Sequence, residues 1–227
     1  MAVLESGEAA VFATIEAKHL AIRTVGHPLD VGTRGAYSAA FVTGVLPAAL
    51  GANSEIFQWR FQSVAGFLCL LRSIKLSAAV STTAFAAGVP IGLAMTLATG
   101  WTAQGTLGTG ITWGANDGKK RSDFATTILT AGDVRIATTA ALGAGTKTLH
   151  AVNARHIIGQ VGAVITSIIP PATMLWLRDT FDEYPFLFEH QEGFVIRSVE
   201  VPATGTWKCA VEIEWAEIDP SVITGWS

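Results

Sequence analysis

The sequence is poor in charged residues and in cysteine. Asp, Glu, Lys and Arg make up 15% of its 227 residues, whereas they make up about a quarter of a typical soluble domain. Hydrophobic residues make up 50%, and the mean hydropathy is +0.42. The two cysteines, Cys69 and Cys209, are too few for a disulfide framework. We therefore expect buried free thiols in a protein synthesised in a reducing cytoplasm, with a single bridge between them as the alternative.

The chain also lacks a segment suited to cross a membrane as a helix. Its most apolar stretch, residues 84–100, contains Gly88, Pro90 and Gly92 and is shorter than the about 20 apolar residues that a spanning helix needs. The first residues include Glu5 and no basic side chain before Lys18, which argues against a signal peptide. We therefore expect a surface that is covered by protein, in an oligomer or an assembly, and no membrane partner.

Signatures of nucleic-acid binding, metal binding and catalysis are scarce as well. The net charge is −3, and the densest basic cluster, residues 119–121, indicates a solvated turn rather than a nucleic-acid site. No nucleophile elbow occurs. The histidines show no metal-ligand spacing between any two of them: His19, His27, His150, His156 and His190. We expect neither an enzyme nor a cofactor, a metal site or a specific nucleic-acid partner.

One pair of carboxylates resembles a catalytic arrangement. Glu212 and Glu214 lie two residues apart on a predicted strand, so their Cα atoms are about 7 Å apart. The carboxylates of glycoside hydrolases are about 5–9.5 Å apart. However, every Glu-x-Glu strand has this spacing, and nothing in the pattern buries either side chain enough to raise its pKa. A solvated sheet face that discourages edge-to-edge pairing is the stronger interpretation.

Alternation of apolar and polar residues at every second position dominates from Gly35 onward, without sustained helical periodicity. With the Gly- and Thr-rich turns, it predicts an all-β fold, a β-sandwich or jelly roll of about eight to ten antiparallel strands. Residues 35–227 are expected to form this single domain. Residues 1–34 are expected to form an N-terminal arm, strand-like at 11–15 and 20–25, suited to add to a neighbour's sheet edge.

Two segments allow the burial of individual strands to be predicted. Residues 55–61 predict a half-buried strand. Residues 67–76 predict a central strand covered on both faces, with Cys69 and Leu71 on one face and Ile74 and Leu76 on the other.

The segments between the strands predict three further features. A short strand is expected near residues 111–113, inside a glycine-rich loop. Ser122 is a suitable N-cap for one short helix. Pro170 and Pro171 are expected to end the apolar run of residues 157–169.

Residues 192–218 predict two strands joined by the turn PATGT, which we expect to form an antiparallel hairpin. The second strand places an apolar face opposite a polar one. That apolar face comprises Trp207, Cys209, Val211, Ile213 and Trp215. We expect Trp207 and Trp215, together with Trp59, to lie in the domain's own core.

The segments NSEIFQWRF, WTAQGTLGTGITWGANDGKKRS, DVRIATTAALGAGTKTL and YPFLFEHQEGFVIRSVEVPATGTWKCAVEIEWAE follow one another in this order. In that order they resemble a family of small virion-associated structural proteins of tailed bacteriophages, over residues 35–218. The resemblance implies a β-sandwich that decorates the capsid as a cement protein and stabilises the head lattice. The implied partners are the major capsid protein and copies of this chain, on the capsid surface of the virion after synthesis in the host cytoplasm. It implies no functional residues.

Three of the seven tryptophans are the candidates for interface contacts, because aromatic side chains are enriched in binding hot spots. Trp101 and Trp113 lie in the glycine-rich loop, and Trp226 lies at the C-terminus. Two other functions stay open. One is a tail or head–tail junction component. The other is a glycan-binding module for host attachment, in which Trp101 and Trp113 stack on a sugar that Asn116 and Asp117 bind.

Overall fold

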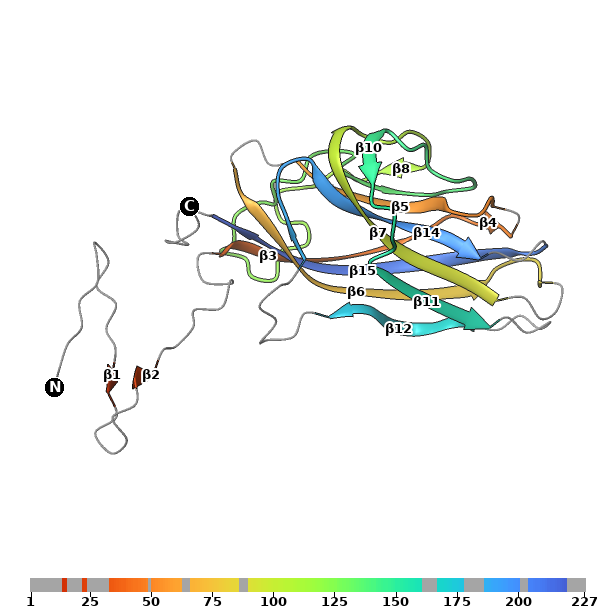
Figure 1. The fold of residues 1–227 in the computed structure, drawn as a ribbon, viewed down its shortest axis with the longest axis horizontal. Helices are drawn as coiled ribbons and strands as arrows, with labels where there is room; N and C mark the ends of the chain where they lie inside the picture. Colours follow the sequence, from red (N-terminus) through yellow and green to blue (C-terminus); the bar gives the residue numbers. More distant parts are fainter. Residues whose placement is uncertain are drawn as a thin grey trace.

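The computed structural model describes residues 14–15, 22–23, 33–48, 50–62, 66–85, 90–160, 167–177, 186–200 and 204–219. These residues form fifteen strands and no helix, and ten of the strands have three residues or more. Two antiparallel sheets pack face to face as two layers (Figure 1). The prediction of an all-β sandwich is therefore confirmed.

The first sheet has seven strands. They are β5 (Ser54–Phe61), β7 (Pro90–Ala103), β8 (Thr109–Gly110), β9 (Val134–Ile136), β10 (Thr146–Leu149), β11 (Arg155–Gln160) and β14 (Glu192–Glu200). Their order is β10-β7-β14-β5-β9-β8, and β11 also pairs with β7. β14 and β7 are therefore central strands, and β11 is an edge strand.

The second sheet has six strands. They are β3 (Thr33–Val42), β4 (Leu46–Pro47), β6 (Leu68–Val80), β12 (Ser167–Leu177), β13 (Leu187–Phe188) and β15 (Thr206–Ile218). Their order is β12-β6-β15-β3, with β13 paired to β6 and β4 to β15. β1 (Thr14–Ile15) and β2 (Ile22–Arg23) pair with each other. Most of the predicted arm lies outside the described residues, so its role stays a prediction.

The aromatic core lies between the two sheets. Trp59, Trp207 and Trp215 are buried there, as predicted. The ring of Trp59 stacks on Phe194 of the same sheet at a centroid distance of 5.5 Å, and it meets Trp215 of the other sheet edge-on at 6.5 Å. Such rings account for much of the apolar area that stabilises a domain. The alternation of residues 207–215 therefore predicted the buried face correctly.

The predicted hairpin of residues 192–218 is wrong. β14 pairs with β5 and β7 in the first sheet, whereas β15 pairs with β6 and β3 in the second. The chain thus crosses from one sheet to the other between these two strands. Both strands are central and have neighbours on both sides, and these neighbours come from distant parts of the sequence.

The predicted faces of the β6 segment are wrong beyond its middle. The inner face of β6 includes Cys69 and Leu71, but also Ile74 and Leu76, which were expected on the opposite face. Between Glu214 and Trp215 of β15, the register on β6 steps from Ser73 to Leu71. β6 thus holds one additional residue there, and a bulge of this kind exchanges the faces that follow it.

β5 is buried on both faces rather than on one. Its polar residues Gln58 and Arg60 are buried, and their partners lie in the loops immediately before and after β9. Arg60 Nη2 lies 2.5 Å from Oδ1 of the buried Asp133, and Gln58 Nε2 donates to the carbonyl of Gly143. Polar partners on these loops therefore compensate the burial of a face that looks solvent-exposed in the sequence.

The expected helix at Ser122 does not form. Residues 122–132 are turns and loop, because the backbone N–H groups of Ile128 and Thr130 donate to the side chains of Glu217 and Asp133. The short strand expected at residues 111–113 lies instead at 109–110, as β8.

Pro170 and Pro171 do not end a strand, and both lie within β12. β12 pairs with β6 through an irregular register, and β6 is its only sheet neighbour among the described strands. Edge strands and bulges tolerate proline, because the missing N–H is not needed by a second neighbour.

Candidate functional site

The three interface candidates occupy different environments. Trp101 lies within β7 and not in the glycine-rich loop, so that predicted placement is wrong. It is 1% exposed, and Nζ of Lys147 lies 4.5 Å from its ring centroid. Trp113 is half-buried and meets Phe41 and Trp215 edge-on at centroid distances of 6.1 and 5.6 Å. Trp226 lies outside the described residues. Their interface role stays a prediction, and Trp113 is the described ring that reaches the surface.

Glu212 and Glu214 lie on the outer face of β15 and form ion pairs. Nζ of Lys75 lies 2.9 Å from Oε1 of Glu212, and Nζ of Lys120 lies 2.7 Å from Oε2 of Glu214. The carboxylates are partly exposed and point away from the core. This geometry is that of the solvated sheet face that the sequence favoured.

Two ion pairs are buried on the first sheet. Arg60 and Asp133 form one, and Thr130 also donates to Asp133 through its backbone N–H and its hydroxyl. Lys147 and Glu55 form the other, with Nζ 2.8 Å from Oε2. Burial lowers the pKa of Lys147, although Glu55 partly offsets this effect. Both pairs tie a distant segment to β5, because Asp133 lies in the loop before β9 and Lys147 lies in β10.

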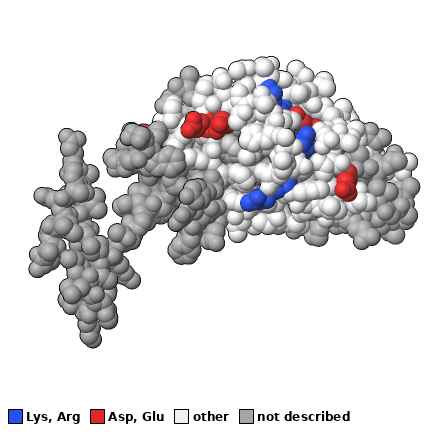
Figure 2. Space-filling model, in the orientation of Figure 1, with Lys and Arg blue, Asp and Glu red and all other residues white. Residues whose placement is uncertain are grey.

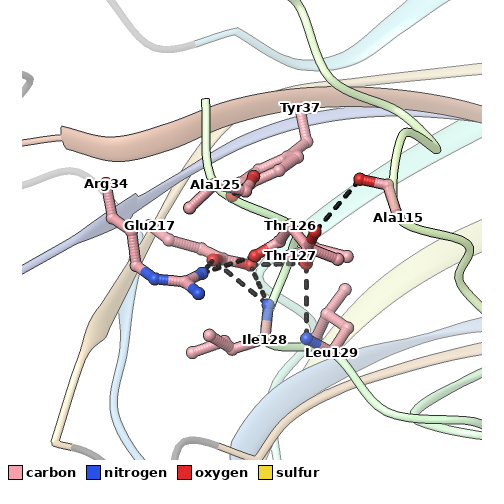
Figure 3. Close-up of polar contacts among 9 residues, drawn as sticks. All are labelled: Arg34, Tyr37, Ala115, Ala125, Thr126, Thr127, Ile128, Leu129 and Glu217. Atoms are coloured by element: carbon pink, nitrogen blue, oxygen red, sulfur yellow. Dashed lines mark hydrogen bonds and ion pairs between the residues drawn. The ribbon is translucent and has the colours of Figure 1, made fainter. Parts of the chain in front are cut away.

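A third buried carboxylate lies near the C-terminal end of β15, and Figure 3 shows it with its partners. Glu217 of β15 is 0% exposed. Its Oε1 accepts hydrogen bonds from the Thr127 hydroxyl at 2.5 Å and from the Ile128 N–H at 3.0 Å. Its Oε2 pairs with Nη1 of Arg34 at 2.8 Å, and Arg34 also donates to the Thr126 carbonyl. One carboxylate thus joins β15, the start of β3 and the loop of residues 125–128.

Burial dominates the electrostatics of this cluster. It raises the pKa of Glu217, against the opposing effects of Thr127, Ile128 and Arg34. It also raises the pKa of Tyr37, whose hydroxyl donates to the Ala125 carbonyl. The thiol of Cys69, the register partner of Glu217, likewise has its pKa raised by burial and then by the nearby carboxylate. Burial is thus the largest influence on the pKa of each of these three groups.

The buried position of Glu217 has a signal in the sequence that the predictions above missed. The alternation that places Trp207 to Trp215 on the inner face continues to residue 217, so a glutamate there interrupts an apolar face. A buried carboxylate needs partners to compensate its desolvation. Its partners Arg34 and Thr127 are 183 and 90 residues away, which no local pattern indicates.

The outer edge of β3 lies beside this cluster and is covered in part. The Ser38 N–H donates to the Gly118 carbonyl at 2.7 Å, and the Lys120 N–H donates to the Ala36 carbonyl at 2.9 Å. Beyond the end of the strand, the Gly44 N–H donates to the Ala137 carbonyl at 3.0 Å. These hydrogen bonds cover both ends of the edge, and we call the two covering segments, at residues 118–120 and at Ala137, the caps. Trp113 lies beside the first cap, next to Gly118.

Metal-binding clusters, membrane-spanning helices and disulfides are absent from the described ranges. Within those ranges, no group of three or more His, Cys, Asp or Glu side chains is placed to hold a metal ion. None of the described elements is a helix able to cross a membrane. Cys69 and Cys209 are buried free thiols, as predicted, and no bridge joins them.

Comparisons with known proteins do not assign the chain to a family. No family model matches it, and a search of curated proteins finds no match either.

Proposed function

We propose that this chain is a structural protein of a phage virion, and that it acts as a capsid decoration protein through protein–protein contacts. The observation that carries the proposal is a surface poor in charge that still exposes apolar side chains. The face in Figure 2 bears few and scattered charged residues. The large exposed apolar side chains include Ile158 of β11 and Met174 and Leu177 of β12. Such surfaces are typical of interaction sites.

The two strands that carry these apolar residues are neighbours. Both are edge strands, one from each sheet, and they lie side by side in Figure 1. The guanidinium carbon of Arg155 in β11 lies 4.7 Å from the ring centroid of Trp176 in β12, which joins the two edges. We define this region as the β11–β12 surface and assign it to the capsid.

The mechanism is burial of surface rather than chemistry. Each subunit bridges neighbouring capsid proteins across a lattice junction and so opposes the outward pressure of packaged DNA. Symmetric repetition makes a modest contact effective, because many copies act on one shell. The resemblance to virion-associated proteins of tailed phages supports the same assignment.

An add-back experiment tests the proposal. Capsids produced without this chain are mixed with the purified full-length protein, and binding and thermal stability of the shell are measured. We expect saturable binding and a more stable shell. Ile158→Asp should weaken binding by placing a charge in the β11–β12 surface. Leu107→Asp is the matched control, because Leu107 is 62% exposed compared with 57% for Ile158 and lies near β8. Absence of binding by the unmodified chain would refute the proposal.

The alternatives have less support from the geometry. A tail or head–tail junction component would use the same kind of contact, and only its copy number would differ. A glycan module would need exposed aromatic rings, but Trp101 is enclosed within its own chain and Trp113 is half-buried. We therefore keep capsid decoration as the proposed function.

A further inference from the structure

We propose that residues 11–15 of a second copy add as a strand to the open edge of β3, at residues 39–42. The inference rests on the self-association that the proposed function includes, and it names the surface and the segment that carry it. Three features support it: the backbone of β3, the sequence of the N-terminal segment and the charges on both.

The edge of β3 is open between its two caps. The N–H groups of Ser38 and Gly44 both point away from β15, because they donate to Gly118 and Ala137. Ala40 and Val42 lie between them at the two-residue period of a strand, so their N–H and C=O groups point the same way. The described residues contain no hydrogen-bond partner for these four groups.

The open edge has none of the usual protection against pairing. Natural edge strands carry lysine, proline or a bulge that discourages an incoming strand. Residues 39–42 read Ala, Ala, Phe and Val, and Val42 is 61% exposed. A strand that pairs here satisfies the free backbone groups of β3 and covers Val42, which is the pattern of strand addition.

Residues 11–15 suit this edge as the incoming strand. They read VFATI, are rich in β-branched and aromatic residues, and are free of glycine and proline. Thr14 and Ile15 already have strand geometry as β1. Ile15 pairs with Ile22, and the 10 residues between Ile22 and Thr33 can span at most about 33 to 36 Å, so β1 can extend well away from its own β3.

The charges of the two partners are complementary. The first 17 residues carry Glu5, Glu8 and Glu16 and no basic side chain. The cap beside the open edge carries the basic cluster of residues 119–121. Lys120 pairs with Glu214 and Arg121 with Asp123, whereas the described residues provide no ion pair for Lys119. Lys119 is therefore the basic side chain of this cluster that can attract the acidic segment, and its attraction falls as salt rises.

Analytical ultracentrifugation of the full-length chain and its variants measures self-association, and so tests whether a strand adds to the edge of β3. Ala40→Pro removes an N–H that has no partner among the described residues of the single chain, so the fold should persist. Self-association should weaken about ten-fold or more, because the hydrogen bond at this position is lost. Val42→Asp leaves the backbone intact and repels the acidic segment, so it should weaken association as well. Ala79→Asp is the matched control, because Ala79 is exposed on β6, two strands away from β3 in the same sheet.

Disulfide trapping identifies the segment that binds. Chains with Ala13→Cys are mixed with chains carrying either Ala40→Cys or Val42→Cys, under mild oxidation. The native cysteines are buried and should not interfere. We expect a linked pair with one chain of each kind, whereas Ala79→Cys chains should not be linked to Ala13→Cys chains.

The outcomes separate this inference from the proposed function. Association that is unchanged in both Ala40→Pro and Val42→Asp, or the absence of any linked pair, would overturn the inference. A double variant that carries both Ala13→Cys and Ala40→Cys tests pairing within one chain. A link that forms inside this double variant, and not between the mixed single variants, would show that the segment pairs with its own sheet and would also overturn the inference. Capsid binding with any of these results leaves the proposed function intact. If the unmodified chain neither binds capsids nor self-associates, both the inference and the proposed function are contradicted.

Discussion

Nη1 of Arg34 lies 2.8 Å from Oε2 of Glu217, although 183 residues separate them in the sequence. This ion pair ties the start of β3 to the end of β15 at a place where Glu217 has no exposed surface. Because the N-terminal segment joins the sandwich at β3, the buried carboxylate fixes the point from which that segment leaves. It also holds the loop of residues 125–128, which Tyr37 and Arg34 contact (Figure 3).

Replacing Glu217 should destabilise the fold strongly. Glu217→Ala removes the acceptor of Thr127 and Ile128 and leaves Arg34 without its carboxylate, so we expect a loss of about 3–5 kcal/mol in the free energy of unfolding. Glu212→Ala on the same strand is the control. The Glu212 side chain is 39% exposed, and an exposed pair contributes at most about 1 kcal/mol. Urea denaturation measures both, and equal losses would contradict the role assigned to Glu217.

The raised pKa of Glu217 predicts a specific pH dependence. In the window between the ordinary value of 4.5 and the raised folded-state pKa, the folded state binds more protons than the unfolded state. The contribution of Glu217 to stability therefore falls as pH rises through this window. Glu217→Gln should lack this fall.

The difference in unfolding free energy between the unmodified chain and Glu217→Gln isolates this effect from other acids. Arg34, Tyr37 and Cys69 are the titratable or charged groups nearest to the carboxylate, and burial raises the pKa of Tyr37 and Cys69. Parallel pH profiles for the two proteins would show that the pKa of Glu217 does not change on folding.

Gly193 is required by close backbone packing. It lies in β14 between β5 and β7, and a Cβ there would be 2.1 Å from the carbonyl oxygen of Trp59. Gly193→Ala must displace the strand, so we expect a loss of about 2–3 kcal/mol in unfolding free energy. Gly51→Ala is the control, because its Cβ would meet no atom closer than 3.7 Å. Thermal unfolding compares the two, and an unchanged Gly193→Ala protein would contradict the packing described.

The two cysteines should resist thiol reagents in the folded protein. Both are buried, and burial raises the pKa of Cys209 to about 12 and that of Cys69 well above its ordinary value. The thiolate is the reactive form, so labelling should require unfolding. Mass spectrometry after treatment with a maleimide, with and without denaturant, tests this. Rapid labelling of the native protein would show that one thiol is accessible.

The sequence predicted local features well where periodicity alone determines them. The alternation of residues 207–215 identified the inner face of β15 and the core positions of Trp207 and Trp215. It failed where one additional residue changes the phase, as in β6, because a bulge has no clear signature in an apolar strand. Gln58 and Arg60 looked exposed for a related reason, since the loops that cover them lie far away in the sequence.

The strands with which each strand pairs could not be predicted from the sequence. β14 and β15 are consecutive and alternate like a hairpin, yet each pairs with strands from distant segments. The same holds for the candidate site. The open edge of β3 is defined by caps at Gly118 and Ala137, which reach it only in the folded chain. The order of segments in the sequence therefore determines neither the strand partners of β14 and β15 nor the caps on β3.

The copy number of this chain in purified virions tests the central claim most directly. Quantitative mass spectrometry would compare it with the major capsid protein in the same particles. The account predicts a ratio comparable to that of the major capsid protein, because a decoration protein occupies the whole lattice. A ratio equivalent to a single ring would instead favour the tail or the head–tail junction. Absence of the chain from the virion would contradict the account.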